Sequence, residues 1–562
     1  MFTPLVALVA LLAVSTPHAK KKTLVRQVAL GVELIQEVTP EGAPGGPLVV
    51  TTLRIDPSVK GVRVEAALGG GTVWDNDSTL GREVPSKTVA QRKAVAGINA
   101  SFFPFAGNPI GLHVENGEVV SEPAMPRTAF VLMDDGTAQF PRFSYEGSVN
   151  GKPLHGFNRK PGKGSELLLF TPIFTDKTLK SEGRVEVVLE GVTLPLKFGP
   201  ELTGKVVSVS EGGQTPISAG TVVLSGGGAL GEWLKEWAKP GETATLALKL
   251  TALDRTLDPA KIAQAVTGAG RLLAAGKFAL DLPAEKLQPS FSTTRHPRTA
   301  VGATADGKLL FVTVDGRQAT LSRGASLTEL AGIMLAQGAV EAVNLDGGGS
   351  SSCAIRGAVA NSPSEGVERP VADSLLVFAD DPMLLPVPLM ITSPEGALEV
   401  GETRRFTLPE SVDPLGVVWT VEGGIGFVDQ EGVFRAQRPG TGTLVLWHGG
   451  QSARVPLAVG KGNVAKAEPK RDKPGFVPQA MFSADGATLT VTIANSEGDK
   501  LGGEAIVLSV TGGVATPNPA TTSPQGEAVV TIQWDPSTAP AARQVKLSSP
   551  GKRFQSVTIK PS

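Results

Sequence analysis

The stretch at 341–352, EAVNLDGGGSSS, gathers the side chains best suited to chemistry. Its apolar residues predict a buried strand that ends at Asn344 and Leu345. Asp346, three glycines and Ser350 follow directly. Consecutive glycines are costly because glycine loses the most backbone entropy on folding, so they indicate a sharp bend or close approach to a ligand. The pattern predicts a carboxylate beside amide and hydroxyl groups, with backbone N–H groups that suit an anion.

Two structural alternatives apply to this stretch. A phosphate-binding P-loop needs Gly-Lys-Ser/Thr followed by a helix. No lysine follows the glycines here, and the next residues, SCAIRGAVA, favour a strand. A plain glycine-rich hairpin turn stays open as the second alternative. It explains the glycines, but it does not explain why Asn, Asp and Ser cluster there.

One helix is expected to position this loop. Residues 325–338, ASLTELAGIMLAQG, place apolar side chains on one face. Ser326 and Glu329 form a capping box at its start, and Gly338 suits its end. The helix leads directly into the strand predicted at 339–345. We therefore expect it to hold the loop rigidly, as a functional site requires.

A motif that occurs twice also leads toward the loop. Pro-Arg-Thr-Ala occurs at 126–129 and 297–300, and each copy precedes a predicted strand and an Asp-Gly turn at the same spacing. The copies are either two unrelated hairpins or two sheet units that face one site, each presenting an arginine. Asn99 likewise ends an apolar strand. Residues 146–245, between the copies, are typical of an insertion of alternating strands.

VNLDGGGSS resembles the signature of the phosphodiester glycosidase family, to which the N-acetylglucosamine-1-phosphodiester α-N-acetylglucosaminidases belong. Four further motifs fit in order: GINASFF at 97–103, LLLFTPIF at 167–174, HPRTAVGATADGK at 296–308 and TVDGRQ at 313–318. The resemblance covers about residues 28–380. It implies a catalytic domain at 24–383 of the α+β class, with mixed and antiparallel sheets. It also implies hydrolysis of a sugar-1-phosphodiester at the anomeric carbon.

Under this resemblance, Asp346 and Asp315 are the candidates for base, nucleophile or cation stabiliser. Arg298 and Arg317 suit the phosphate, because a guanidinium fork matches two oxygens. His296 is expected near the substrate but not as the proton carrier. The remaining substrate-binding candidates are Asn99, Thr299, Asn344, Gly347, Gly348, Gly349 and Ser350.

Each charged candidate has a structural alternative. Asp315 precedes a glycine, and Asp-Gly commonly just makes a hairpin. Arg298 would serve equally as half of an ion pair at a strand edge. Asp346 would serve as a cap on the amides of its own loop.

Composition bounds the function classes. A chain of 562 residues is expected to hold several domains, and a formal net charge of −1 gives no electrostatic case for a nucleic-acid partner. The single cysteine, Cys353, has no intramolecular disulfide partner and fits a small buried residue. Five histidines without an HxxxH or CxxC pattern give zinc no support. We predict no metal and no cofactor.

The N-terminus predicts export. Residues 1–19 contain a short apolar run followed by small residues, which is typical of a signal peptide cleaved after Ala19. The alternative is an uncleaved anchor. No other stretch approaches the ~18 apolar residues of a membrane span. We expect a secreted or cell-envelope protein that does not contact the membrane after cleavage.

After residue 383 the sequence changes to short predicted strands separated by Gly and Pro turns. Residues 388–460, with VVWTVEGG and GTGTLVLW, resemble a bacterial immunoglobulin-like domain of group 2. Residues 461–475 are typical of a basic flexible linker. Residues 476–562 resemble a group 1, invasin-like module. We expect two all-β sandwiches with separate cores, which are dispensable for hydrolysis of a small substrate and able to bind envelope glycan.

Two functions follow. The first is an exported glycosidase that hydrolyses a sugar-1-phosphodiester in envelope or extracellular glycan. The second is a non-catalytic glycan-binding or adhesin protein that displays the same pocket. Retention of both Asp346 and Arg298 favours the enzyme, because a binding protein could lose the carboxylate.

Overall fold

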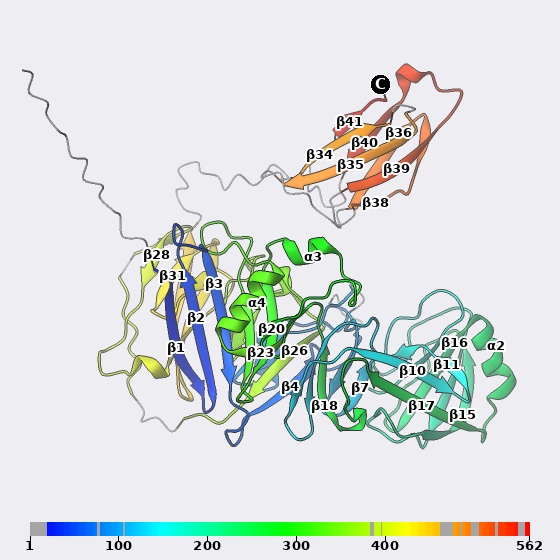
Figure 1. The fold of residues 1–562 in the computed structure, drawn as a ribbon, viewed down its shortest axis with the longest axis horizontal. Coiled ribbons are helices and arrows are strands. Elements are labelled where there is room, and N and C mark those ends of the chain that lie inside the picture. The colour runs from blue at the N-terminus through cyan, green and yellow to red at the C-terminus, as the bar shows by residue number, and fades with distance from the viewer. Residues whose placement is uncertain are drawn as a thin grey trace, which may run out of the picture.

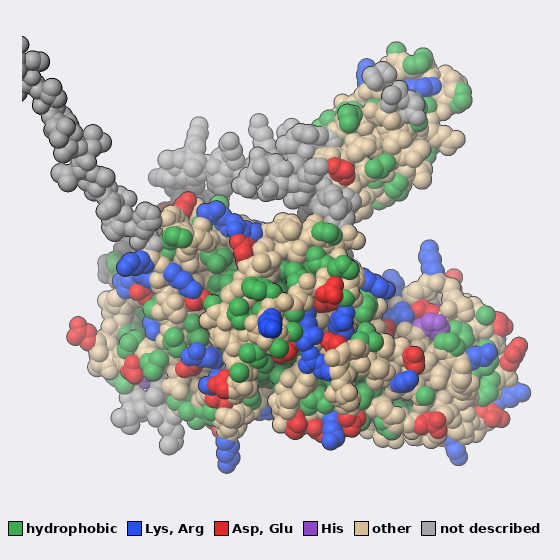
Figure 2. Space-filling view, viewed as in Figure 1, with side chains coloured by type: hydrophobic (Ala, Val, Ile, Leu, Met, Phe, Trp, Pro, Cys, Tyr) green, Lys and Arg blue, Asp and Glu red, His purple; other side chains and the backbone are tan. Residues whose placement is uncertain are grey.

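A computed structural model provides the structure of this chain (Figure 1). It describes residues 20–75, 79–104, 107–382, 387–394, 396–460, 476–483, 486–495, 505–522, 527–548 and 557–561. The predicted signal peptide at 1–19 and the predicted linker at 461–475 lie outside the described residues. Within the part of the chain that is described, no helix is long and apolar enough to cross a membrane. Acidic and basic side chains are interspersed over the face shown in Figure 2, in keeping with the small net charge.

The site is built on an antiparallel sheet of eight strands. Arg298 opens one strand and pairs with Val314, which ends the next strand. Ala300 pairs with Asn344, which ends a third. The candidate residues on these strands therefore meet at one end of the sheet. In order across the sheet, the strands are β1 (Lys22–Ala29), β2 (Val32–Thr39), β3 (Leu48–Ile55), β22 (Leu309–Val314), β21 (Arg298–Thr304), β23 (Ala339–Asn344), β19 (Arg271–Ala274) and β20 (Lys277–Phe278).

A nine-stranded sheet provides the second wall. The main hydrophobic core contains Leu53 and Phe311 from the first sheet and Ile98, Cys353 and Leu375 from the second. In order, the second sheet comprises β27 (Leu398–Glu399), β33 (Gln451–Gly460), β32 (Gly440–His448), β29 (Val417–Glu422), β25 (Ala358–Val359), β24 (Cys353–Ile355), β5 (Ala96–Asn99), β26 (Asp373–Phe378) and β4 (Arg63–Leu68).

The helix predicted before the loop is confirmed. It is α4 (Leu327–Ala336), and both hydrogen bonds of the capping box between Ser326 and Glu329 are present. Gly338 has a φ of 93°, as the end of this helix requires. Leu330 and Met334 are buried against the face of the eight-stranded sheet that faces away from the main core. The other helices in the described parts are short: α1 (Pro85–Gln91), α2 (Gly228–Trp237) and α3 (Pro289–Thr293).

The α+β class predicted for the catalytic region is wrong, because the structure is mostly β. Residues 325–338 combine a helical period with a capping box, whereas most of the remaining region alternates with the period of a strand. Sheets therefore cover sheets. A five-stranded sheet comprises β7 (Glu118–Ser121), β6 (His113–Glu115), β18 (Ile262–Thr267), β8 (Ala129–Met133) and β9 (Ala138–Gln139).

The predicted insertion forms most of an eight-stranded sheet, and its core also includes Val114, Val131 and Ala265 of the five-stranded sheet. In Figure 1 it lies beside β7 and β18 and carries α2. Its strands in order are β11 (Lys152–Leu154), β10 (Phe143–Val149), β17 (Thr243–Ala252), β15 (Leu202–Glu211), β14 (Arg184–Glu190), β16 (Thr221–Gly227), β13 (Leu167–Phe170) and β12 (Gly156–Phe157).

The first C-terminal module, residues 396–460, is not a separate unit. It has its own core around Trp419, between part of the nine-stranded sheet and a small sheet of β28 (Thr403–Arg405), β31 (Val433–Ala436) and β30 (Gly426–Val428). However, Val421 pairs with Val359 of the catalytic region, so the nine-stranded sheet runs through both parts. Val418 and Trp447 also pack in or against the main core. The expectation of wholly separate cores is therefore wrong for this module.

The second C-terminal module, residues 476–561, has two four-stranded sheets around its own core. One sheet comprises β34 (Phe476–Phe482), β35 (Thr488–Asn495), β39 (Glu527–Trp534) and β37 (Gly513–Thr516). The other comprises β38 (Ala520–Thr521), β36 (Ala505–Thr511), β40 (Gln544–Ser548) and β41 (Val557–Ile559). The immunoglobulin-like class of both modules stays a prediction.

Candidate functional site

Asn99 joins the loop after β23 to its neighbours, as its place at a strand end predicted. Its Nδ2 donates to the carbonyl oxygen of Asp346 at 2.7 Å. Its Oδ1 accepts from Thr299 Oγ1 at 2.9 Å and from the N–H of Ser352 at 3.1 Å. Asn99, Thr299 and Ser352 are all buried. The structure therefore brings these residues together, and their contacts serve to fix the loop.

The three glycines let other groups approach the loop closely. Gly348 has a φ of 63°, and a Cβ there would lie 3.3 Å from Nη2 of Arg317. A Cβ on Gly349 would overlap Arg369 and Glu365. The backbone N–H of Gly348 donates to the carbonyl of Pro297 at 2.8 Å. The N–H of Gly347 donates to the Asp346 carboxylate. These two N–H groups are thus used inside the protein and do not form the predicted anion site.

Asp346 is a half-buried carboxylate at the end of β23. It accepts hydrogen bonds from the Ser350 hydroxyl and from the N–H of Gly347. Burial raises the pKa of Asp346 to about 6; the Asp373 carboxylate contributes to this rise, and the Ser350 hydroxyl and the Arg369 guanidinium oppose it. A carboxyl group on a partly exposed residue, with a pKa raised toward neutral pH, is suited to acid–base or nucleophilic chemistry.

Asp315 lies in a different environment. Its side chain is buried, and it accepts from Asn361 Nδ2 at 2.8 Å and from the N–H of Ser362 at 3.0 Å. Burial raises the pKa of Asp315 to about 7. These contacts favour the structural alternative, in which Asp315 fixes the segment at 361–362. Its catalytic role stays a prediction.

The Arg298 guanidinium binds backbone carbonyls and forms no ion pair among the described residues, and its predicted contact with phosphate stays a prediction. Its Nε donates to the carbonyl of Ala325 at 3.0 Å, and its Nη2 donates to the carbonyls of Phe291 and Thr294 at 3.0 and 2.8 Å. Burial, with a smaller contribution from Arg317, lowers the pKa of Arg298 to about 10. Arg298 therefore fixes the segment that leads into β21.

Arg317 is the predicted phosphate partner that stays exposed. Its φ of 59° is unusual for a residue with a side chain, and such strain is often found at functional sites. Its Nη2 lies 3.3 Å from Nδ1 of His296. Burial, together with the positive charges of Arg317 and Arg298, lowers the pKa of His296 to about 4. His296 is therefore neutral at pH 7, which agrees with the expectation that it does not carry the proton.

Asn344 faces another loop. Its Nδ2 donates to the carbonyl of Ala269 at 3.0 Å, while its Oδ1 is buried without a partner among the described residues. Asn344 thus fixes the loop after β18, and its predicted contact with substrate stays a prediction.

Sequence reasoning missed a buried group next to Asp346. The Asp373 carboxylate accepts from the N–H and Oγ of Ser101, both at 2.7 Å, and lies 2.7 Å from Nδ1 of His113. Both His113 and Asp373 are fully buried. The signal was the position of Asp373 at the head of the apolar run DSLLVF, because a charge buried there needs partners.

Arg369 was also missed. Its Nη1 lies 3.4 Å from Oγ of Ser350, and its guanidinium pairs with Glu365. Arg369 thereby places a positive charge near Asp346. No recognised motif covers the segment at 360–373 that carries Arg369 and Asp373.

The first C-terminal module supports two of these loops. Gln437 Nε2 donates to Gln318 Oε1 at 2.9 Å and to Ser362 Oγ at 3.1 Å. Arg438 Nη1 donates to the carbonyl of Glu365 at 2.9 Å. The module therefore contacts the segment after Arg317 and the segment before Arg369.

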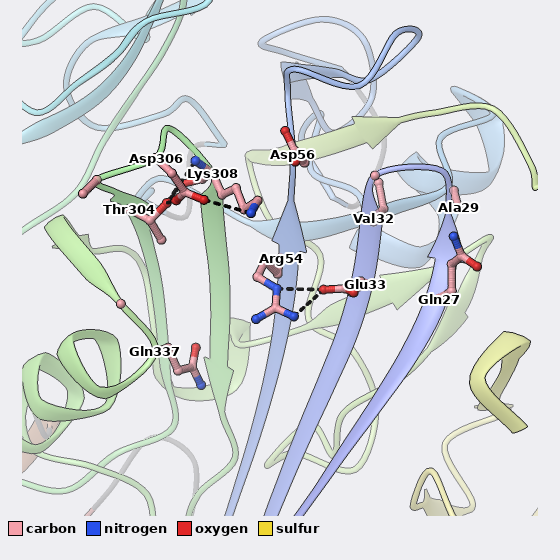
Figure 3. A pocket seen from close by; sticks show the side chains of 13 residues that line it. Gln27, Ala29, Val32, Glu33, Arg54, Asp56, Thr304, Asp306, Lys308 and Gln337 are labelled. Carbon is pink, nitrogen blue, oxygen red and sulfur yellow. Dashed lines mark hydrogen bonds and ion pairs between the residues drawn. The ribbon is translucent and has the colours of Figure 1, made fainter.

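A pocket of about 690 Å³ lies elsewhere (Figure 3). Its lining includes Thr304, Asp306 and Lys308, at the opposite end of β21 from Arg298. The strand spans roughly 20 Å between them. The pocket's ion pairs, Arg54 with Glu33 and Lys308 with Asp306, are complete. It is therefore distinct from the candidate site. Among the described residues, no group of three His, Cys, Asp or Glu is placed to hold a metal.

The family expectation is confirmed for the catalytic region. The model of the phosphodiester glycosidase family matches residues 201–378, which include the loop, Arg317 and Asp373. Residues 201–378 therefore match a phosphodiester glycosidase domain, as the motifs predicted.

Individual relatives match over short segments. The SPbeta prophage-derived uncharacterized protein YomE of Bacillus subtilis (strain 168) is 42% identical over 88 residues, which cover 16% of this chain and 14% of YomE. The N-acetylglucosamine-1-phosphodiester alpha-N-acetylglucosaminidase of Bos taurus is 46% identical over 68 residues, 12% of each chain. Less than a sixth of either relative is therefore spanned. A solved structure from Burkholderia pseudomallei is 27% identical with a TM-score of 0.50, and the match covers 61% of this chain and 76% of that one.

Proposed function

We propose that this chain is an exported hydrolase that cleaves a sugar-1-phosphodiester at the anomeric carbon. The sugar is N-acetylglucosamine-like, and the substrate belongs to envelope or extracellular glycan. One observation carries the proposal. The partly exposed Asp346, with its carboxyl pKa raised to about 6, shares one loop cluster with the exposed Arg317 and with Arg369.

The chemistry has two requirements. A phosphomonoester is a good leaving group, so a strong general acid is less necessary than in ordinary glycoside hydrolysis. The site must hold the phosphodiester anion and stabilise an oxocarbenium-like sugar. Arg317 supplies a guanidinium fork for the anion. Ionised Asp346 supplies negative charge at the anomeric carbon.

The bond changes follow from these roles. The bond between the anomeric carbon and the phosphate oxygen breaks, and its electron pair leaves with the phosphate. Water supplies the oxygen that replaces it, giving a free sugar and a phosphomonoester. Ser350 and Arg369 orient Asp346, while the buried Ser101, His113 and Asp373 keep the adjoining wall rigid.

Export is supported by the signal-peptide pattern at 1–19. An exported enzyme meets sugar phosphodiesters in envelope or extracellular material, which is why that substrate is proposed.

The test is product analysis with the purified chain on a panel of sugar-1-phosphodiesters. The proposal expects equal amounts of free sugar and phosphomonoester. If the chain is instead a glycan-binding protein, it should bind the phosphodiester and release no products. Binding without turnover on every member of the panel would refute the enzymatic proposal.

A further inference from the structure

The repeated Pro-Arg-Thr-Ala motif belongs to two sheet units that meet at the site. After the first copy, Ala129 of β8 pairs with Thr267 at the end of β18. After the second copy, Ala300 of β21 pairs with Asn344 at the end of β23. The loops that follow touch, since the N–H of Ala269 donates to the carbonyl of Asn344 at 2.8 Å. Each unit therefore places one arginine, Arg127 or Arg298, at the same end.

The two arginines differ in their partners. Arg298 donates to three carbonyls. The Arg127 guanidinium has no hydrogen-bond acceptor among the described residues, and its Nε is buried. Burial lowers the pKa of Arg127 more than the negative charge of Glu285 raises it. The Glu285 carboxylate already accepts hydrogen bonds from the N–H and Oγ1 of Thr128 and from the N–H groups of Gly270 and Arg271.

This difference predicts a missing acceptor. Burial lowers the pKa of Arg127, because removal from water disfavours the charged form. Arg127 is partly exposed, but its buried Nε–H has no acceptor within the described part of the chain, which is unfavourable. An anionic ligand would satisfy it.

Arg127 contacts the segment that follows Asn99. Its guanidinium lies 5.8 Å from the ring centroid of Phe102, three residues after Asn99. The Phe102 ring lies 6.1 Å from that of Phe291, which packs under Arg298. Arg127 is therefore linked to the site through two aromatic rings.

A cleft opens along the segment that leads to Arg127, although Arg127 itself does not line it. Residues 121–124, just before Arg127, line a volume of about 660 Å³. The other wall comes from the insertion and carries Tyr145, His155 and Arg159, and Arg159 pairs with Glu122 and Glu166. The lining also includes the carboxylates of Glu122 and Glu146, so of the residues that the structure describes here, Arg127 is the cation left to bind an anion. The Tyr145 hydroxyl is buried without a partner among the residues described. Figure 1 shows β7, which ends at Ser121, beside this insertion. The cleft offers room and polar groups for an extended leaving group.

We propose that Arg127 binds a second anion on the leaving group, and that the leaving group extends along residues 121–124 into this cleft. The preferred substrate is a sugar-1-phosphodiester whose leaving group ends in another phosphate or a carboxylate. This inference rests on the proposed function and names the substrate class of the same site.

The test compares substrates that share one sugar and one alkyl leaving group. The alkyl chain ends in hydroxyl, carboxylate or phosphate. With the full chain, we expect one of the two charged substrates, carboxylate or phosphate, to have a kcat/KM roughly 10-fold or more above that of the hydroxyl substrate. This is the range expected for one charge-assisted hydrogen bond. The carboxylate and phosphate arms identify the anion. Added salt should reduce the advantage.

Variants then locate the subsite. Arg127→Gln should bring the ratio of charged to hydroxyl substrate close to one. Arg127→Lys, which keeps the charge without the planar fork, should give an intermediate ratio. Arg63→Gln is the matched control, because Arg63 also lies over a phenylalanine ring, Phe378, at 3.8 Å. It lies at the end of β26 opposite to Asp373 and should keep the wild-type ratio.

The outcomes separate the two proposals. A wild-type ratio near one, with the hydroxyl substrate still hydrolysed, would overturn the subsite and leave the proposed function standing. An Arg127→Gln enzyme that kept the wild-type ratio would also overturn it. Hydrolysis of none of the substrates would count against the proposed function itself.

Discussion

Replacing Asp346 by asparagine should abolish turnover and stabilise the protein. The amide keeps the shape of the carboxylate, and its oxygen still accepts from Ser350 and Gly347. It supplies no negative charge to an oxocarbenium-like centre. We therefore expect kcat to fall by roughly 1,000-fold or more, while KM changes little.

The stability gain follows from the pKa. Burial raises the pKa of Asp346 from 3.8 to about 6 in the folded protein. The folded state then holds the proton more tightly than the unfolded state, so stability is highest at low pH. It falls as the pH rises from about 3.8 to about 6, and the full cost persists above pH 6. At roughly 1.4 kcal/mol per pH unit, the cost is about 3 kcal/mol.

The asparagine variant escapes that cost but loses the hydrogen bonds to a charged acceptor, worth about 1–2 kcal/mol. We expect a net stabilisation of about 1–2 kcal/mol at pH 7.5 and none below pH 4. Thermal unfolding of both proteins at the two pH values measures it, at about 2–4 °C for each kcal/mol. A folded variant with near-normal kcat would refute the catalytic role. Equal destabilisation at both pH values would show instead that Asp346 caps its own loop.

Three further predictions concern the same site. The value of kcat/KM should fall about tenfold per pH unit below about pH 6, because ionised Asp346 is required; a profile flat down to pH 4 would contradict this. Gln437→Ala should raise KM roughly 3- to 10-fold by releasing the segment after Arg317, whereas the exposed Gln451→Ala should not; equal KM values in both variants would mean that the first C-terminal module does not support the site. A chain that ends at residue 460 should hydrolyse a small substrate normally, because the second module has its own core; loss of activity in the folded truncation would show that this module contributes.

Local patterns predicted the framework around the loop. The capping box, the helix and the strand that follows depend on residues close in sequence, and the structure has all three. The Asp-Gly turns after both Pro-Arg-Thr-Ala copies are also present, with Gly136 and Gly307 both at φ 83°. Such features follow from backbone preferences that act over a few residues.

The remaining features depend on contacts between distant residues. His113 and Asp373 are 260 residues apart, and no spacing rule connects them. The Arg298 guanidinium donates to the backbone carbonyls of Phe291 and Thr294, and no side-chain pattern in the sequence predicts such contacts. The pairing of Val359 with Val421 depends on which sheet edge the catalytic region leaves open. For that reason the first C-terminal module, which the sequence predicts to be separate, joins the sheet of the catalytic region.

The most direct test asks which bond breaks. The purified chain would hydrolyse a sugar-1-phosphodiester in water enriched in oxygen-18, and mass spectrometry would locate the label in the products. Attack at the anomeric carbon, as proposed for the site around Asp346, places the label in the free sugar and none in the phosphomonoester. Label in the phosphomonoester would mean that the phosphorus–oxygen bond breaks, and it would contradict a glycosidase mechanism at this site.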